Sequence, residues 1–215
     1  MRSLLLGIAL IVLIGVGGLV YRNAVEHPSQ PIACPLDAEV CPDGTSVSRV
    51  GSSCTFPACP PPNVLLSVVG IAYAVPAGFA AVALPDAPSI AAYEEPAAAS
   101  STGAANIVIR QYAIAASSTA LATIEATAIG GASGAPVPVT AFSSTILGTH
   151  RFTVVSIEQF EGTVDTAYYL ARGVDVLRFD AIDQGVADWN NPAINLSTLP
   201  AGQALRALLS NLQGG

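Results

Sequence analysis

The chain has 215 residues, with eight arginines, no lysine and fifteen acidic residues, which gives a net charge of −7. A negatively charged protein repels a phosphate backbone instead of releasing its counterions, so nucleic acid is excluded as a partner. The lack of lysine also excludes Schiff-base and Walker-type chemistry, because both need an ε-amine.

An uncharged apolar run from Leu4 to Val20 predicts an N-terminal transmembrane anchor, residues 1–22. As a helix this run would be about 26 Å long, close to the roughly 30 Å of a bilayer's hydrocarbon core. Tyr21 can extend it in the headgroup layer, so the membrane is the expected partner of residues 4–21. The alternative is a cleaved signal peptide and a secreted protein, but the apolar run is longer than a usual signal peptide's and no Ala-x-Ala site follows it.

Four cysteines follow the anchor within one short segment, at Cys34, Cys41, Cys54 and Cys59. An even number of clustered cysteines after an export signal predicts two disulfides, for which three pairings are possible. The gaps between the cysteines differ from the CxxC-like pairs of zinc sites, so no metal is expected. The disulfides predict that the part of the chain after the anchor is extracytoplasmic.

The turn Pro42-Asp43-Gly44 after Cys41 is similar to a stretch of Kazal-type inhibitors, which need more cysteines than this segment has. A protease-inhibitor-like or adhesion role of the segment is therefore kept as an alternative. Residues 34–60 more closely resemble a four-cysteine module, without assigned activity, of exported proteins from bacterial candidate phyla. Because Pro60-Pro61-Pro62 forms a stiff polyproline break, we interpret residues 23–62 as a disulfide-stapled stalk.

Residues 63–215 are expected to form an α+β domain with a mainly antiparallel sheet flanked by helices. Gly162 and Gly173 mark tight turns that join the last three strands into a meander. A helix capped by Ser118 or Thr119 is expected, and a final helix whose leucines form one apolar stripe should pack on the sheet. The candidate strands are residues 67–75, 79–84, 107–114, 137–147, 151–160, 163–171 and 175–182, and the candidate helices are residues 120–129 and 201–213.

Several short motifs follow one another through this domain. They are Tyr73-Ala-Val-Pro-Ala-Gly-Phe79, Ile107-Val-Ile-Arg110, Phe160-Glu-Gly-Thr163 and Tyr168-Tyr-Leu170. Together with a helix before the meander and a helix after it, this order resembles the PsbP-like fold over residues 67–213. The resemblance implies an extracytoplasmic binding or assembly module that is not an enzyme, and no metal or partner residues of the family are carried over.

His150 and Trp189 are the candidate binding residues of the domain. A hydrolase that uses His150 as its base is kept as an alternative, but no recognisable nucleophile motif surrounds this histidine. A single tryptophan usually serves packing, so Trp189 would bind a ligand only if it is exposed. The aspartates of residues 175–188 lack the spacing of a calcium loop. No catalytic residue, metal or cofactor is therefore predicted.

These inferences together predict a single-pass protein of the cell membrane with an extracytoplasmic C-terminal domain. We expect the domain to act as a binding or envelope-assembly component without catalysis. Its partner would be a protein or a small molecule that the sequence does not identify.

Overall fold

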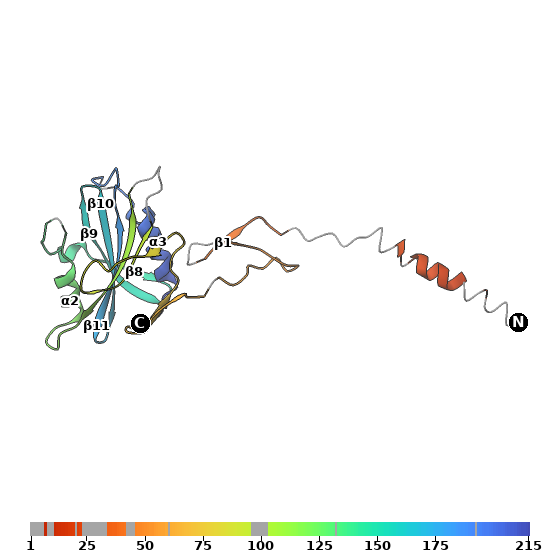
Figure 1. Cartoon of the computed structure of the whole chain (residues 1–215), viewed down its shortest axis with the longest axis horizontal. Coiled ribbons are helices and arrows are strands. Elements are labelled where there is room, and N and C mark those ends of the chain that lie inside the picture. The colour runs from red at the N-terminus through yellow and green to blue at the C-terminus, as the bar shows by residue number, and fades with distance from the viewer. Residues whose placement is uncertain are drawn as a thin grey trace. The chain divides into compact units, whose positions relative to one another are not determined.

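The computed structural model describes residues 7, 11–19, 21–22, 34–41, 46–59, 61–95, 103–131, 133–191 and 193–215 (Figure 1). The chain divides into two compact units, one of residues 1–37 with 49–56 and one of residues 38–48 with 57–215. The predicted division into an anchor, a stalk and a domain, with boundaries after residues 22 and 62, stays a prediction.

The described N-terminal residues 11–19 and 21–22 are helical. The predicted membrane-spanning segment, residues 4–21, also includes residues 4–6, 8–10 and 20, which lie outside the described residues. In the part of the chain that the structure describes, no helix is both long enough and apolar enough to cross a membrane. The transmembrane anchor therefore stays a prediction.

The four cysteines form two disulfides, which confirms the prediction from their clustering. Cys34 is bonded to Cys54 and Cys41 to Cys59, with Cα atoms 5.3 and 5.5 Å apart. Of the three possible pairings, the structure thus has the interlaced one, in which each loop contains one cysteine of the other bond. Disulfides persist in oxidising compartments, so these bonds indicate an extracytoplasmic protein.

Noncovalent interactions also join described residues of the cysteine segment. In the first unit, Arg49 donates from Nε to the carboxylate of Asp37 at 2.8 Å, and its guanidinium lies 4.1 Å from the centroid of the Phe56 ring. In the second unit, β1 (Ala38–Val40) pairs antiparallel with β2 (Ser46–Ser48). Because so short a segment buries little apolar surface, the covalent bonds are its main restraint.

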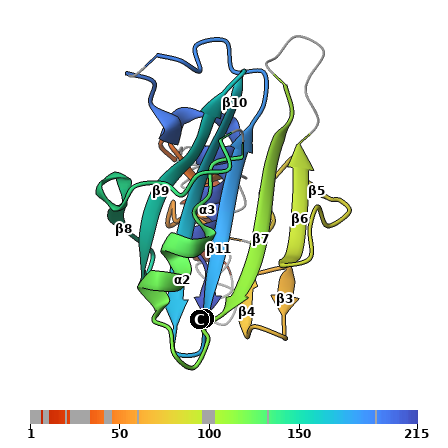
Figure 2. The same cartoon turned by 90° about the vertical axis from the view of Figure 1, so that its left-hand side faces the viewer.

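Within the described residues, seven strands form an antiparallel sheet in the order β5-β6-β7-β11-β10-β9-β8 (Figure 2). This sheet confirms the predicted α+β class, and β9, β10 and β11 form the predicted meander. At the first turn, Glu161 and Gly162 have φ angles of 48° and 82°, as a two-residue type I′ hairpin requires. The strands are β5 (Ala80–Ala81), β6 (Ser89–Glu95), β7 (Ala105–Ala113), β8 (Ser143–Leu147), β9 (His150–Phe160), β10 (Thr163–Arg172) and β11 (Asp175–Asp183).

Helices lie on both faces of this sheet. Figures 1 and 2 show α2 (Ala120–Thr127) on one face and α3 (Pro200–Ser210) on the other. Two short 3₁₀ helices, η1 (Val139–Ala141) and η2 (Leu196–Thr198), lie in connections. A smaller sheet of described strands has the order β12-β4-β3, and its strands are β3 (Val64–Leu66), β4 (Ile71–Tyr73) and β12 (Gln213–Gly214).

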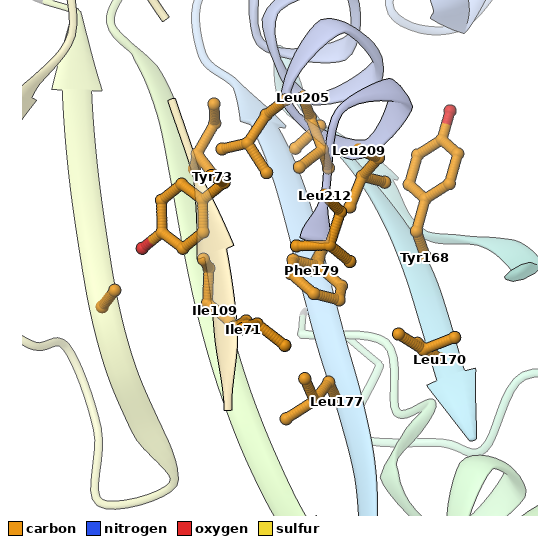
Figure 3. Packing of buried hydrophobic residues seen from close by; sticks show 14 of the residues in the cluster. Ile71, Tyr73, Ile109, Tyr168, Leu170, Leu177, Phe179, Leu205, Leu209 and Leu212 are labelled. Carbon is orange, nitrogen blue, oxygen red and sulfur yellow. The ribbon is translucent and has the colours of Figure 1, made fainter. Parts of the chain in front are cut away.

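The larger core lies between the main sheet, the smaller sheet and α3. Leu205 and Leu209 of α3 are fully buried and point toward Phe179 of β11 (Figure 3). Ile71 and Tyr73 of β4 belong to the same cluster. The predicted leucine stripe is thus confirmed, and each such leucine contributes about 1.5 to 3 kcal/mol by its burial.

A smaller core lies under α2. Ile124 of α2 packs with Val155 and Tyr169 of the sheet in a cluster separate from the larger core. The helix begins as predicted, because the Thr119 hydroxyl accepts a hydrogen bond from the N–H of Ala122 at 3.1 Å.

The structure differs from the predicted elements in several places. Strands β3 and β12 were not predicted, and α3 ends at Ser210 instead of residue 213. Predicted strand 67–75 is interrupted by a turn in which Gly70 has a φ of +65°, which favours glycine. Predicted strand 137–147 begins with η1 and becomes a strand only at Ser143. Strand β6 was missed, since Ala91 and Ala92 at its centre give little β-propensity.

Candidate ligand-binding groove

A groove lies on the face of the sheet that also carries α2. The helix packs against β10 and β11 (Figure 2). The groove is lined mainly by residues of β6 and β7. We call it the sheet groove. Its floor includes Ala92 of β6 and Val108 of β7, and its wall includes Val82, Ala83 and Pro85. Its volume is about 420 Å³, within the range of small-molecule sites.

Strand alternation explains which side chains face the sheet groove. Residues two apart on a strand share a face, so Asn106 and Arg110 lie on the same side as Val108. Glu94 is directly opposite Asn106 in the β6–β7 ladder, and Asn106 is opposite Ile182 in the β7–β11 ladder. Opposite side chains in such a ladder start about 5 Å apart. Glu94 and Asn106 are therefore neighbours on the floor of the groove.

Arg110 lies at the other end of the sheet groove and belongs to a network of charges. Its Nε donates to Asp86 at 2.8 Å, and its Nη1 donates to Asp180. Asp180 also accepts from Nε of Arg178 at 2.6 Å. Arg110 and Arg178 are directly opposite on β7 and β11. The fully buried carboxylate of Asp180 therefore offsets two neighbouring positive charges.

The same network holds α2 on the sheet. Nη1 of Arg178 donates to the carbonyl oxygen of Thr127, the last residue of α2, at 2.7 Å. The last carbonyls of a helix lack intrahelical partners and carry partial negative charge, which favours a cation there. Arg178 thus links the end of α2 to the ion pairs under the sheet groove.

Asp165 of β10 lies beside this network and has a buried oxygen without a partner. Its Oδ2 is 3.5 Å from Nη2 of Arg178, while its Oδ1 has no hydrogen bond to any described residue. Glu158 lies directly opposite on β9. Burial raises the pKa of Asp165 well above its usual range, and the carboxylate of Asp180 raises it further. Ile182 lies between Asp165 and the sheet groove in the strand register.

Three polar side chains of the sheet groove have unused hydrogen-bonding capacity. Glu94, Asn106 and Gln184 line the groove and make no side-chain hydrogen bond or ion pair within the described residues. Glu94 and Asn106 are half-buried, whereas Gln184 is exposed at the rim, and polar groups buried in folded proteins usually have partners. Such groups around a concave, partly apolar surface are what a ligand site requires.

The two predicted binding residues lie far apart. His150 begins β9 and Phe160 ends it, a separation of about 30 Å along a strand. Trp189 packs edge to face against Phe160, with ring centroids 6.0 Å apart, and is half-buried. The structure therefore does not bring His150 and Trp189 into one site, and it places neither in the sheet groove.

His150 lies beside a different cavity of about 500 Å³, lined by residues 148–150 and 210–215. Its Nδ1 is 3.3 Å from the hydroxyl of Thr149. No serine or carboxylate of the described residues hydrogen-bonds to its ring, so no nucleophile and base are paired there. Among the described residues, no group of three or more His, Cys, Asp or Glu could hold a metal ion.

Comparison with known proteins does not indicate a function for the chain. No protein-family model matches the chain, and neither does any curated protein. A solved crystal structure from Bacteroides thetaiotaomicron VPI-5482 is similar with a TM-score of 0.39 and 11% identity. The similarity covers 67% of this chain and 45% of that chain, so this chain spans less than half of that protein's length. A similarity this low carries no argument about function.

Sequence reasoning missed the residues of the sheet groove because it missed β6. The run Ser89-Ile-Ala-Ala-Tyr-Glu-Glu95 is bounded by Pro85 and Pro88 on one side and Pro96 on the other, which is a strand signal. Only the fold, however, shows that β6 pairs with β7 and that β7 pairs with the distant β11.

Proposed function

We propose that this protein is an extracytoplasmic binding protein, held at the membrane by its N-terminal segment, that takes up a small ligand in the sheet groove without catalysing a reaction. One observation carries the proposal. A concave surface of about 420 Å³ combines an apolar floor with Glu94, Asn106 and Gln184, whose polar groups lack partners within the described residues. Sites for small ligands have this composition.

Two further features support the proposal. The disulfides indicate an extracytoplasmic protein, where a binding or assembly role is common and cytosolic substrates are absent. The order of motifs from Tyr73 to Leu170 supports a PsbP-like architecture, and that resemblance implies a binding module. The predicted anchor, residues 4–21, would keep such a module at the cell surface.

The proposal can be tested by filling the sheet groove. Ala83 is an exposed residue of its wall, so Ala83→Trp should block the groove without disturbing the core. Ala122→Trp, on an exposed position of α2, is the matched control. The full chain in a nonionic detergent would be screened by ligand-observed NMR against short-chain amines, alcohols and carboxylic acids.

The expected result is that compounds which bind the unmodified chain also bind Ala122→Trp but no longer bind Ala83→Trp. If every binding compound binds Ala83→Trp equally well, the groove is not the site and the proposal is wrong. It is equally wrong if none of the three compound classes binds the unmodified chain.

A further inference from the structure

We infer that the sheet groove recognises a primary ammonium group on an aliphatic chain, so that the ligand is a small alkylamine. This inference rests on the proposed function and names the chemistry of its ligand. It follows from the balance of charge, the positions of hydrogen-bond acceptors and the shape of the apolar floor.

The charges of the sheet groove favour a cation. Arg110 lines the groove, and Asp86 and Asp180 together offset its charge and that of the neighbouring Arg178. The half-buried carboxylate of Glu94 has no counter-ion in the part of the chain that the structure describes. An unpaired carboxylate in a partly desolvated groove attracts an opposite charge more strongly than one in bulk water. The same carboxylate would repel a ligand that carries a carboxylate of its own.

The acceptors near Glu94 suit an ammonium group. Asn106 lies directly across the ladder from Glu94, and Gln184 lines the same end of the groove. Each side-chain amide offers a carbonyl oxygen, and an ammonium group has three N–H donors and no acceptor. A carboxylate with two amide oxygens therefore provides one acceptor for each donor. A quaternary ammonium group has the same charge but could use none of these oxygens.

The floor beyond these acceptors suits an aliphatic chain. Val108 lies two residues along β7 from Asn106, and Ile182 and Val82 line the same groove. Asn106 and Arg110 are about 13 Å apart along the strand. An alkyl chain that starts at Glu94 thus lies on apolar side chains before it reaches Arg110.

The test compares probes of one length on the full chain in a nonionic detergent. The probes are n-pentylamine, which is protonated at neutral pH, pentyltrimethylammonium, 1-pentanol and pentanoate. Ligand-observed NMR titrations would give the Kd of each. We expect n-pentylammonium to bind at least about tenfold more tightly than the other three, and added salt to weaken it.

Glu94→Gln and Glu95→Gln form a matched pair, because Glu95 is the next residue but lines a different cavity beside α3. We expect Glu94→Gln to weaken n-pentylammonium about tenfold and Glu95→Gln to leave its Kd unchanged. Equal binding of pentanol or pentanoate, or no effect of Glu94→Gln, would overturn the inference.

The inference and the proposed function fail in different ways. If Ala83→Trp abolishes the binding of a neutral or anionic probe, the groove is a ligand site and only the ammonium assignment is wrong. If Ala83→Trp leaves all binding intact, the groove is not the site, and both are wrong. Tight binding of pentyltrimethylammonium would show that the groove recognises positive charge without hydrogen bonds. That result also contradicts the inference of a hydrogen-bonded primary ammonium group.

Discussion

The carboxylate of Asp183, the last residue of β11, accepts a hydrogen bond from the backbone N–H of Ala201 at 2.8 Å. Ala201 lies in the first turn of α3, whose N-cap residue, Leu199, has no side chain that can bond to the helix. A residue of the sheet thus supplies the N-terminal cap of a helix 18 positions away in the sequence. The bond joins the sheet to the helix that covers the larger core.

Loss of this cap should destabilise the fold. In Asp183→Ala the N–H of Ala201 stays buried without an acceptor, so we expect the free energy of unfolding to fall by about 2 kcal/mol. Asp183→Asn keeps an acceptor oxygen and should lose less than about 1 kcal/mol. Urea unfolding of the full chain measures both. The control, Asp188→Ala, changes an exposed aspartate of the following loop, and an equal loss in this variant would contradict the capping role.

Sequence patterns predicted those parts of the fold that depend on neighbours in the chain. Gly162 between two strands rich in β-branched residues predicts a hairpin, and Thr119 before an apolar run predicts a helix start. The cap from Asp183 could not be predicted, because local rules expect a capping residue directly before the helix. The same limit applies to the sheet groove, since no local signal shows that Glu94 faces Asn106 or that both lie near Gln184.

Asp165 should make the stability depend on pH. Burial raises the pKa of its carboxyl well above the ordinary value of 3.8, and the carboxylate of Asp180 adds to this effect. Between these two values the folded state binds more protons at this site than the unfolded state. The contribution of Asp165 to the free energy of unfolding therefore falls as the pH rises through this window.

Asp165→Asn removes the titrating group, so its stability relative to the unmodified chain should increase as the pH is raised from about 4 to neutral. Urea unfolding at a series of pH values measures the difference. Asp86→Asn should show the opposite trend, with a stability relative to the unmodified chain that decreases as the pH rises. Partial burial raises the pKa of Asp86, but hydrogen bonds from Ser89 and Arg110 hold it below its usual value. Its stabilisation is therefore lost as the pH falls below about 4. Parallel pH curves for the two variants would contradict this assignment.

The contributions of Arg178 and Asp180 to the free energy of unfolding should be strongly coupled. Arg178→Met leaves the fully buried carboxylate of Asp180 with one fewer counter-ion and removes the donor to the carbonyl of Thr127. We expect a loss of about 3 to 5 kcal/mol in the free energy of unfolding. The double variant Arg178→Met with Asp180→Leu removes both charges and should recover at least about 1 kcal/mol relative to the sum of the single changes.

Arg151→Met is the control for this cycle. Arg151 is exposed on β9 and makes a 3.3 Å hydrogen bond to the hydroxyl of Ser144. We expect its replacement to change the free energy of unfolding by less than about 0.5 kcal/mol. If Arg178→Met and Asp180→Leu are additive, or if Arg178→Met resembles Arg151→Met, the buried network does not stabilise the fold.

The pairing of the cysteines gives a chemical prediction that local sequence rules could not make, because their spacing permits three connectivities. In the structure Cys34 is bonded to Cys54 and Cys41 to Cys59. Cys34→Ser should therefore release a thiol at Cys54, and Cys41→Ser should release one at Cys59. Each variant would be unfolded without reductant at mildly acidic pH, which slows exchange by keeping thiols protonated, and labelled with N-ethylmaleimide. Peptide sequencing by mass spectrometry locates the label. A label on Cys59 in the first variant or on Cys54 in the second would show that the two bonds are paired differently.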